Sequence, residues 1–255
     1  MRRALVVPAA GRGSRLQIGG AKALVPVNGR PMLDRLLDMY SGYVCSAVVI
    51  VSPAHEDAIR RHCAPRGSAV RIAVQGAPTG MLDAILAGSD AVRATRPERV
   101  WITWCDQVGI HPQTLERLAS LEDSDPAAAM LLPTVQRSSP YIHFDRDASG
   151  RIASVRQRRE GNAMPPAGES DAGLFALSAA AFEALTRFGA DADVGVRTAE
   201  RNFLPFIPWL ARTERVVTFA STDPREAIGV NTAEELAAVE AYLRERDALR
   251  GGERP

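Results

Sequence analysis

The stretch from Val6 to Lys22, VVPAAGRGSRLQIGGAK, constrains this chain more than any other. It begins within an apolar run typical of a buried strand, Ala4–Val7. A loop of small residues follows, and this loop carries two cations, Arg15 and Lys22. Small residues let backbone N–H groups approach an oxyanion closely, an arginine adds a fork of donors, and a lysine adds a point charge. The loop is therefore a candidate phosphate-binding site. The alternative is an ordinary turn between a strand and a helix, with both cations in solvent.

Two features of the same stretch argue against a dinucleotide-binding fingerprint. Leu16 stands where the third glycine of that fingerprint is expected. Glycines and prolines between positions 19 and 31 also prevent a regular helix before Met32. The loop is therefore long, and it can surround a larger polyanion than a dinucleotide pyrophosphate.

Strand-like and helix-like segments alternate through the first half of the chain. We expect strands at Ala47–Val51, Val70–Val74, Val100–Trp104 and Ala127–Leu132, and helices at His55–Cys63, Met81–Ala94 and Pro112–Glu122. This alternation predicts a mostly parallel sheet with helices on both faces, and ligands bind beyond the carboxyl ends of such strands. The glycine loop, the loop at 75–80 and Asp106 all follow expected strands.

The second half has a different character. We expect a hairpin of Tyr141–Asp145 with Arg151–Arg156, followed by a polar loop from Arg158 to Ser170. Further strands are expected at Asp171–Leu177 and Val216–Phe219, and helices at Ser178–Arg187, Thr198–Ala211 and Thr232–Leu249, with Thr232 as an N-cap and Glu235 as its capping-box partner. Without a visible repeat or linker, we expect one domain over residues 1–255, with a lobe over the sheet edge.

The composition excludes several classes of protein. The 255 residues are 46% hydrophobic and 24% charged, as in an ordinary globule. A formal net charge of +1 gives no bulk attraction to nucleic acid or to an anionic membrane, and no apolar run approaches the ~18 residues of a membrane span. Three scattered cysteines suit neither a disulfide framework nor a zinc site. We therefore expect a cytoplasmic protein without nucleic-acid or membrane partners, and leave a homo-oligomer open.

AAGRGSRL followed by AKALVPVNGRPML resembles the opening of the sugar-phosphate nucleotidyltransferases, most closely the uridylyltransferase domain of the N-acetylglucosamine-1-phosphate enzymes. In this stretch Ala21 replaces the usual proline. The resemblance implies a three-layer α/β, Rossmann-like (GT-A-like) fold with a mixed, mostly parallel sheet. It also implies a nucleotide-binding half at 1–135 and an acceptor-binding half, with a small β lobe, at 136–255. It assigns nucleotide binding to Ala9, Ala10, Gly11, Gly13 and Ser14, and catalysis to Arg15 and Lys22.

Asp106 and Asn231 are the candidate ligands of Mg²⁺. WITWCDQVGI resembles the family segment in which a strand ends in Gly-Asp and the Asp holds the metal, although Cys105 replaces that glycine. GVNT resembles the closing motif whose Asn is the second ligand. Mg²⁺ usually takes one or two protein oxygens and leaves its other positions to water and phosphates. The alternatives are that Asp106 caps the helix at Pro112 and that Asn231 only precedes the N-cap.

Gln75 and Gly80 occupy the place where the family reads a uracil or thymine base, in the segment VQGAPTGMLDAI. A glutamine amide presents a donor and an acceptor side by side, as the edge of an imide requires. Met81 replaces the threonine that the family has after this glycine. UTP or dTTP is therefore favoured and CTP stays open; the alternative is an ordinary polar loop.

The acceptor side departs from the family pattern. PYIHF replaces a segment with Gly-Tyr-Gly-Arg, Arg156 replaces a sugar-binding Glu, and DAG at 171–173 replaces Asn-x-Gly. We expect Tyr141, Arg156, Asp171 and Gly173 to bind an acceptor other than N-acetylglucosamine-1-phosphate. Arg156 and Arg158 share a strand face at period two, so they either bind an anionic acceptor or form a solvated edge.

The resemblance implies transfer of a nucleoside monophosphate from an NTP to a phosphorylated acceptor, most naturally a sugar-1-phosphate, with release of pyrophosphate and dependence on Mg²⁺. The nucleophile is already an anion, so charge neutralisation and alignment are what the site must supply. One alternative is a cytidylyltransferase acting on a phosphorylated alcohol or phosphonate. A second is a catalytically silent nucleotide-binding regulatory subunit, and a nicotinamide-dependent dehydrogenase is the weakest.

Overall fold

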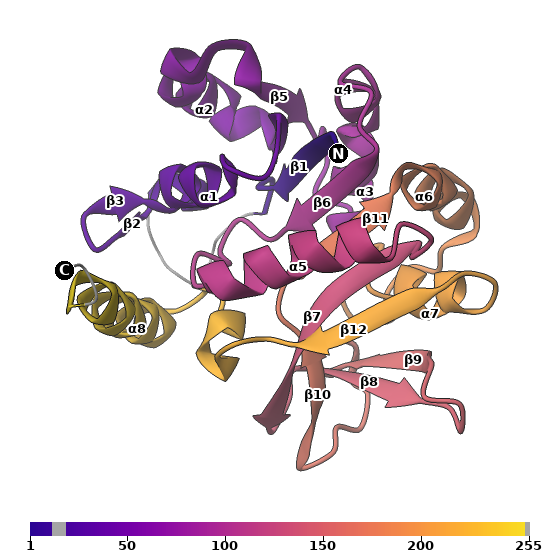
Figure 1. Cartoon of the computed structure of the whole chain (residues 1–255). Coiled ribbons are helices and arrows are strands. Elements are labelled where there is room, and N and C mark those ends of the chain that lie inside the picture. The colour runs from indigo at the N-terminus through magenta and orange to yellow at the C-terminus, as the bar shows by residue number, and fades with distance from the viewer. Residues whose placement is uncertain (12–18, 253–255) are drawn as a thin grey trace.

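A mixed sheet runs through the centre of the molecule, with helices on both of its faces (Figure 1). The computed structural model describes residues 1–11 and 19–252. The strands of this sheet are β1 (Arg3–Pro8), β4 (Ser46–Val51), β5 (Val70–Val74), β6 (Arg99–Thr103), β7 (Met130–Ser138), β10 (Ala167–Asp171), β11 (Leu174–Ser178) and β12 (Val216–Ala220). Their order is β10-β7-β11-β6-β1-β4-β5, with β12 paired to β7. The predicted three-layer α/β fold is confirmed.

The half of the sheet formed by β5, β4, β1 and β6 is parallel throughout. From Ala4 onward β1 is buried, and its residues alternate between two cores: Leu5 and Val7 pack into one, Ala4 and Val6 into the other. A strand covered on both faces needs this continuous apolar run. Parallel strands end at one edge of the sheet, so the segments after β1, β5 and β6 meet there, as predicted.

The helices are α1 (Met32–Tyr40), α2 (Glu56–Cys63), α3 (Met81–Ala87), α4 (Ser89–Arg93), α5 (Pro112–Ser124), α6 (Ala179–Asp191), α7 (Phe206–Ala211) and α8 (Ala233–Gly252). Helix α1 begins at Met32, as the preceding glycines and prolines predict. The single helix expected at Met81–Ala94 is instead two helices that meet at Gly88.

The expected helix Thr198–Ala211 is wrong in its first half, because only Phe206–Ala211 is helical. The backbone of Arg201 bonds to another segment instead: its N–H donates to Thr79 O at 2.7 Å, and its carbonyl accepts from Leu82 N at 3.1 Å. These contacts attach the segment before α7 to the loop between β5 and α3.

The hairpin of β8 (Ile142–Arg146) and β9 (Ile152–Gln157) forms the predicted small lobe and lies beside β10 (Figure 1). Arg146 joins the two sheets through a 2.6 Å ion pair with Glu169 of β10. The polar segment that follows the hairpin is not a plain loop, because it contains a 3-10 helix, η5 (Arg158–Glu160), and then β10.

The predicted strand Asp171–Leu177 is confirmed only from Leu174 onward, because the chain turns at Gly173, where φ is +74°. β10 ends before this turn and β11 begins after it. β7 crosses residue 135, so the two predicted halves share one sheet.

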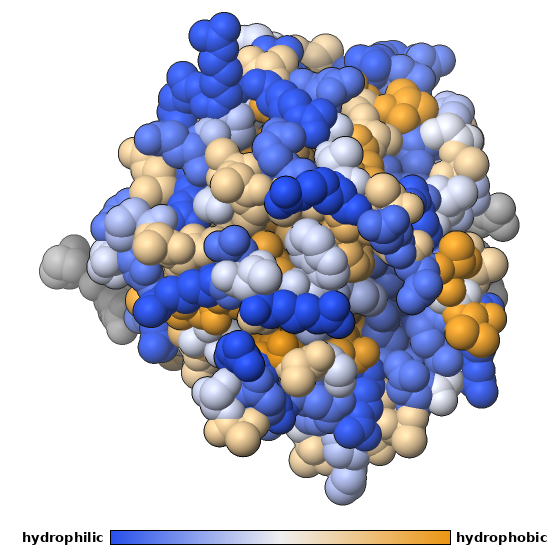
Figure 2. Space-filling model, turned by 90° about the vertical axis from the view of Figure 1, so that its right-hand side faces the viewer, coloured by the Kyte–Doolittle hydropathy of each residue, from blue (hydrophilic) through white to orange (hydrophobic). Residues whose placement is uncertain are grey.

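The surface on the α4, α6 and α7 side is mostly polar (Figure 2). Apolar side chains appear there in small, separate groups, which is ordinary for a globular surface. Of the helices in residues 1–11 and 19–252, none combines the length and the apolar character needed to cross a membrane.

Gly80 yields a test of the loop between β5 and α3. Its φ of +123° and ψ of 175° are open almost only to glycine, and a Cβ there would overlap the backbone of Arg201. We expect Gly80→Ala to lower the free energy of unfolding by about 3 kcal/mol in urea denaturation. Gly76→Ala is the control, because a Cβ at Gly76 meets no atom within 4 Å. Equal losses in the two variants would contradict the loop geometry.

Candidate functional site

Two adjoining cavities lie at the edge of the sheet where the parallel strands end. The first has a volume of about 540 Å³ and reaches from the end of β1 to the loop after β5. The second, of about 410 Å³, extends toward β7, β10 and the hairpin. Residues that line both are Met81, Trp104, Asp106, Arg159 and Asn231. The two predicted metal ligands therefore lie where the cavities meet.

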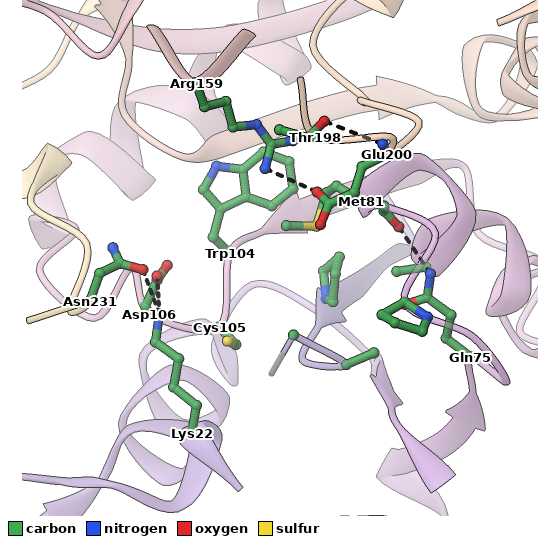
Figure 3. A pocket seen from close by; sticks show the side chains of 16 residues that line it. Lys22, Gln75, Met81, Trp104, Cys105, Asp106, Arg159, Thr198, Glu200 and Asn231 are labelled. Carbon is green, nitrogen blue, oxygen red and sulfur yellow. Dashed lines mark hydrogen bonds and ion pairs between the residues drawn. The ribbon is translucent and has the colours of Figure 1, made fainter. Parts of the chain in front are cut away.

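Lys22 lies between the two predicted metal ligands. Its Nζ is 2.6 Å from Asp106 Oδ2 and donates a hydrogen bond to Asn231 Oδ1 at 2.8 Å (Figure 3). Lys22 opens a short 3-10 helix, η2 (Lys22–Leu24), Asp106 follows β6, and Asn231 precedes α8. The side chains of Lys22 and Asp106 are only 12% and 15% exposed. The structure thus holds one cation between a carboxylate and an amide oxygen.

The backbone around Asp106 packs directly on the segment that carries Asn231. Asp106 O accepts a hydrogen bond from Val230 N at 3.2 Å. A Cβ added to Gly229 would lie 3.3 Å from Asp106 Cγ and from Asn231 Nδ2, closer than such contacts normally are. Because Gly229 has no side chain, the side chains of the two predicted metal ligands can lie next to each other.

The alternative roles of Asp106 and Asn231 can be compared with the caps that the structure forms. The N-cap of α5 is His111, whose Nδ1 accepts from Gln113 N at 3.2 Å, so Asp106 is not that cap. The predicted capping box before α8 is present: Thr232 Oγ1 accepts from Glu235 N at 3.2 Å, and Glu235 Oε2 accepts from Thr232 N at 3.0 Å. Thr232 therefore fulfils the capping role, while the Asn231 amide contacts Lys22.

Glu226, which the sequence reading did not single out, connects the loop after β6 to the segment before Asn231. It is fully buried in the 3-10 helix η6 (Pro224–Ala227), and its carboxylate accepts from His111 N at 2.9 Å and from Thr114 Oγ1 at 2.9 Å. Its carbonyl accepts from the Gln107 side chain. Burial raises the pKa of Glu226, and the hydrogen bonds oppose that rise. In the sequence, Glu226 could have been identified by its capping-box spacing from Asp223.

The oxygens of Asp106 and Asn231 suit a hard divalent cation. One carboxylate and one amide oxygen converge on a single position, which a cationic ammonium group occupies. Mg²⁺ is commonly held by few protein oxygens and completed by substrate phosphates. In the part of the chain that the structure describes, there is no cluster of three or more His, Cys, Asp or Glu residues suited to a metal. The donor set therefore fits the predicted ion.

The predicted nucleotide-binding residues lie along the first cavity where the structure describes them. Ala10, Gly11, Gln75 and Gly80 line it, and Ala9 is fixed at its edge by a 2.7 Å hydrogen bond from its N–H to Ile50 O. Gly13, Ser14 and Arg15 lie outside the described residues.

Gln75 and Asn231 are at opposite ends of the first cavity (Figure 3). The Gln75 amide is buried, and its Nε2 donates to Gly80 O at 3.0 Å, so it also fixes its own loop. Its role in reading a base stays a prediction.

The structure separates the predicted acceptor-binding residues. Tyr141, Asp171 and Gly173 line the second cavity. Arg156 is not among the described residues that line either cavity, because its guanidinium pairs with Asp145 across the hairpin at 2.7 and 2.8 Å. Side chains alternate along a strand, so Gln157 lines the cavity instead. The position of Arg156 therefore speaks against its predicted role.

Arg158, the other half of the predicted anion-binding pair, supports the loop before the hairpin. Its Nη2 donates to Ser139 Oγ at 2.8 Å and to Pro140 O at 3.1 Å. The next residue, Arg159, borders both cavities and pairs with Glu200 at 3.1 Å (Figure 3). The sequence carries no signal for Arg159, because the polar, glycine- and proline-rich composition of its segment is typical of a loop.

Asp171 and Gly173 build a tight turn beneath the second cavity. Asp171 Oδ1 accepts from Gly173 N at 2.8 Å, and Gly173 O accepts from Thr103 Oγ1 at 3.0 Å and from Trp104 N at 3.3 Å. The turn thereby supports the end of β6, next to Asp106. Burial raises the pKa of Asp171 to about 6, although the hydrogen bond from Gly173 works in the opposite direction.

Residues 5–170 match the family described as the MobA-like NTP transferase domain. Several curated proteins, each named Bifunctional protein GlmU, are similar along almost the whole chain. The protein of Sorangium cellulosum is 29% identical, over 96% of this chain and 52% of its own length. That of Anaeromyxobacter sp. is 31% identical, over 96% and 50%, and that of Kineococcus radiotolerans is 29% identical, over 97% and 50%.

This chain spans about half the length of these relatives. The matches confirm the resemblance drawn from the opening loop and place the chain in the nucleotidyltransferase class.

The raised pKa of Asp171 makes the stability of the protein depend on pH. That pKa is about 6 in the folded protein, compared with 3.8 for an ordinary aspartate, so the folded protein holds this proton more tightly than the unfolded chain does. The resulting stabilisation is complete below about pH 4 and is lost as pH rises through about 6. Asp171→Asn cannot ionise but keeps an oxygen for Gly173 N–H. We therefore expect this variant to gain stability relative to the wild type between about pH 4 and pH 7, in urea denaturation at a series of pH values. A difference that stays constant over that range would refute the assignment.

Proposed function

This chain belongs to the MobA-like NTP transferase domain family, and from that premise we propose that it transfers a nucleoside monophosphate from an NTP to a phosphorylated acceptor, most naturally a sugar-1-phosphate. The observation that carries this proposal is that the two cavities meet at Asp106 and Asn231, both of which contact Lys22 on the wall of the first cavity. Transfer between two substrates requires that both reach one reacting centre in alignment, and two adjoining cavities allow this. The first cavity receives the NTP and the second the acceptor.

The shape of the first cavity supports an extended nucleotide. Gln75 lies at one end and the Lys22 cluster at the other (Figure 3), so a base at the first end leaves the phosphates near the second. Gly11 brings backbone to the wall of the cavity with no side chain. UTP or dTTP is the favoured donor, since an imide edge matches a glutamine amide, and CTP is the alternative.

Asp106 and Asn231 are the residues that would hold Mg²⁺. When bound, the ion supplies positive charge that neutralises the triphosphate and stabilises the charge that develops on it. Glu226 and Gly229 contribute indirectly, because they keep the two oxygen ligands adjacent. That the ion is Mg²⁺, and that the reaction depends on it, are both part of the proposal.

Lys22 is the protein's own cation at the reacting centre. It is also the only lysine among the 31 lysine and arginine residues of the sequence. In the reaction, an acceptor phosphate oxygen forms a bond to the α-phosphorus while the bond from that phosphorus to the α–β bridging oxygen breaks, and pyrophosphate leaves. The attacking oxygen is already ionised, so no proton has to be removed. Lys22 reduces the repulsion between the two polyanions and aligns them.

The direct test is a substrate panel. Purified protein is incubated with each of the four NTPs, a set of sugar-1-phosphates and Mg²⁺, and pyrophosphate release is measured. We expect release to require both an NTP and a phosphorylated acceptor. Release only with CTP and a phosphorylated alcohol or phosphonate would select the cytidylyltransferase alternative. Tight NTP binding without release in any combination would favour a silent regulatory subunit and reject the proposal.

Substitution of Lys22 tests the mechanism. We expect Lys22→Ala to lose about 2–4 kcal/mol of transition-state stabilisation, which is roughly a 30- to 1,000-fold fall in kcat/KM. Lys22→Arg keeps the charge with a different geometry and should retain more activity than Lys22→Ala. Circular dichroism serves as the check on folding. Activity of a folded Lys22→Ala protein within about threefold of the wild type would contradict the role of the ammonium group.

A further inference from the structure

The second cavity contains an arginine, Arg137, whose charge is not balanced by an ion pair in the described part of the chain. Arg137 is half-buried near the end of β7, and its Nη1 donates to Ala227 O at 3.2 Å. Among residues 1–11 and 19–249, no carboxylate forms an ion pair with it. Arg159, the other arginine on the described walls of the two cavities, differs because it pairs with Glu200 at 3.1 Å.

The carboxylates that line the second cavity already have other partners. Asp106 pairs with Lys22 at 2.6 Å. Asp171 accepts the N–H of Gly173 at 2.8 Å, and Glu235 accepts the N–H groups of Asn231 and Thr232. Asp171, on the same cavity wall, interacts electrostatically with Arg137 but does not form an ion pair with it. A half-buried guanidinium that no carboxylate contacts directly favours an anionic ligand. Arg137 is therefore a preformed cation that faces the acceptor cavity.

Arg137 is not among the described residues at which the two cavities meet. It lines the second cavity only, whereas reacting atoms from both substrates must meet at residues that line both cavities. Its contact with Ala227 O holds the guanidinium against the segment two residues before Gly229. Ser138 and Ser139 follow Arg137 along the same wall and add hydroxyl groups. This wall suits an anionic group that does not take part in the transfer.

We propose that Arg137 binds a second anionic group of the acceptor, so that the acceptor is an acidic sugar phosphate. The inference rests on the proposed function and deepens it by naming the acceptor class. A planar guanidinium matches a carboxylate or a phosphate through two parallel hydrogen bonds. The second group is therefore either a sugar carboxylate or a second phosphate. Of the two roles open to Arg156 and Arg158, the binding of an anionic acceptor belongs instead to Arg137.

The test compares three kinds of acceptor in the pyrophosphate-release assay with the full chain and Mg²⁺. These are neutral sugar-1-phosphates, uronic acid 1-phosphates and sugar 1,6-bisphosphates, each in glucose and galactose configuration. The wild type should use at least one acidic acceptor about tenfold better in kcat/KM than its neutral counterpart. The better of the two acidic kinds identifies the second group.

Substitution at Arg137 then assigns the preference to this residue. Arg137→Gln keeps a donor for Ala227 O but has no charge, and it should lower kcat/KM for the acidic acceptor by roughly 10- to 100-fold. The neutral acceptor and the KM for NTP should change less than about threefold. Arg71→Gln is the matched control, because Arg71 is exposed on β5, at the opposite edge of the sheet from β10. Arg137→Lys retains charge and should keep part of the preference; it replaces Arg137→Gln if that variant does not fold.

Three outcomes would overturn the inference, and they differ in what else they remove. A wild type that prefers neutral acceptors refutes the acidic acceptor and leaves the proposed function intact. If Arg137→Gln lowers kcat/KM equally for acidic and neutral acceptors, Arg137 serves the reacting phosphate or the fold. Absence of pyrophosphate release with every acceptor removes the proposed function, and this inference with it.

Discussion

The ion pair between Lys22 and Asp106, completed by the Asn231 amide, is the contact on which the rest of the site depends. It joins residues that are 84 and 209 positions apart in the sequence. Parallel strands make the first juxtaposition, since β1 and β6 are neighbours and end at one edge. The second depends on the buried carboxylate of Glu226, which ties the segment before α8 to the loop after β6. An enzyme of this class must place positive charge and oxygen ligands together, and this contact does both.

Much of the fold was predictable because several elements, most of them in the first half, obey local rules. The buried run of β1, the start of α1 at Met32 and the Thr232–Glu235 capping box each follow from nearby residues alone. The second half depends on distant contacts. The polar composition of β10, AGESD, resembles a loop, and only its pairing with β7 makes this segment a strand. The segment around Arg201 is non-helical because its backbone bonds to Thr79 and Leu82.

The same distinction explains which site residues were found. Lys22, Asp106 and Asn231 belong to motifs with recognisable spacing, and the structure brings them together. Arg156 was chosen by position in a hairpin, where a shift of one residue moves a side chain to the opposite face. Gln157 lines the second cavity, where Arg156 was expected. Arg137 carries no motif, and only its place on the cavity wall, without an ion pair in the described residues, marks it.

Because Lys22 is the only lysine in the sequence, one spectrum can test the central claim that a triphosphate and a divalent ion bind beside it. Protein labelled with ¹⁵N-lysine gives a single side-chain ammonium resonance, which NMR can follow during titration with UTP and Mg²⁺. We expect this resonance to shift on addition of the nucleotide with Mg²⁺, and to shift far less in Asp106→Asn. A Lys22 signal that stays unchanged while the nucleotide demonstrably binds would contradict this claim.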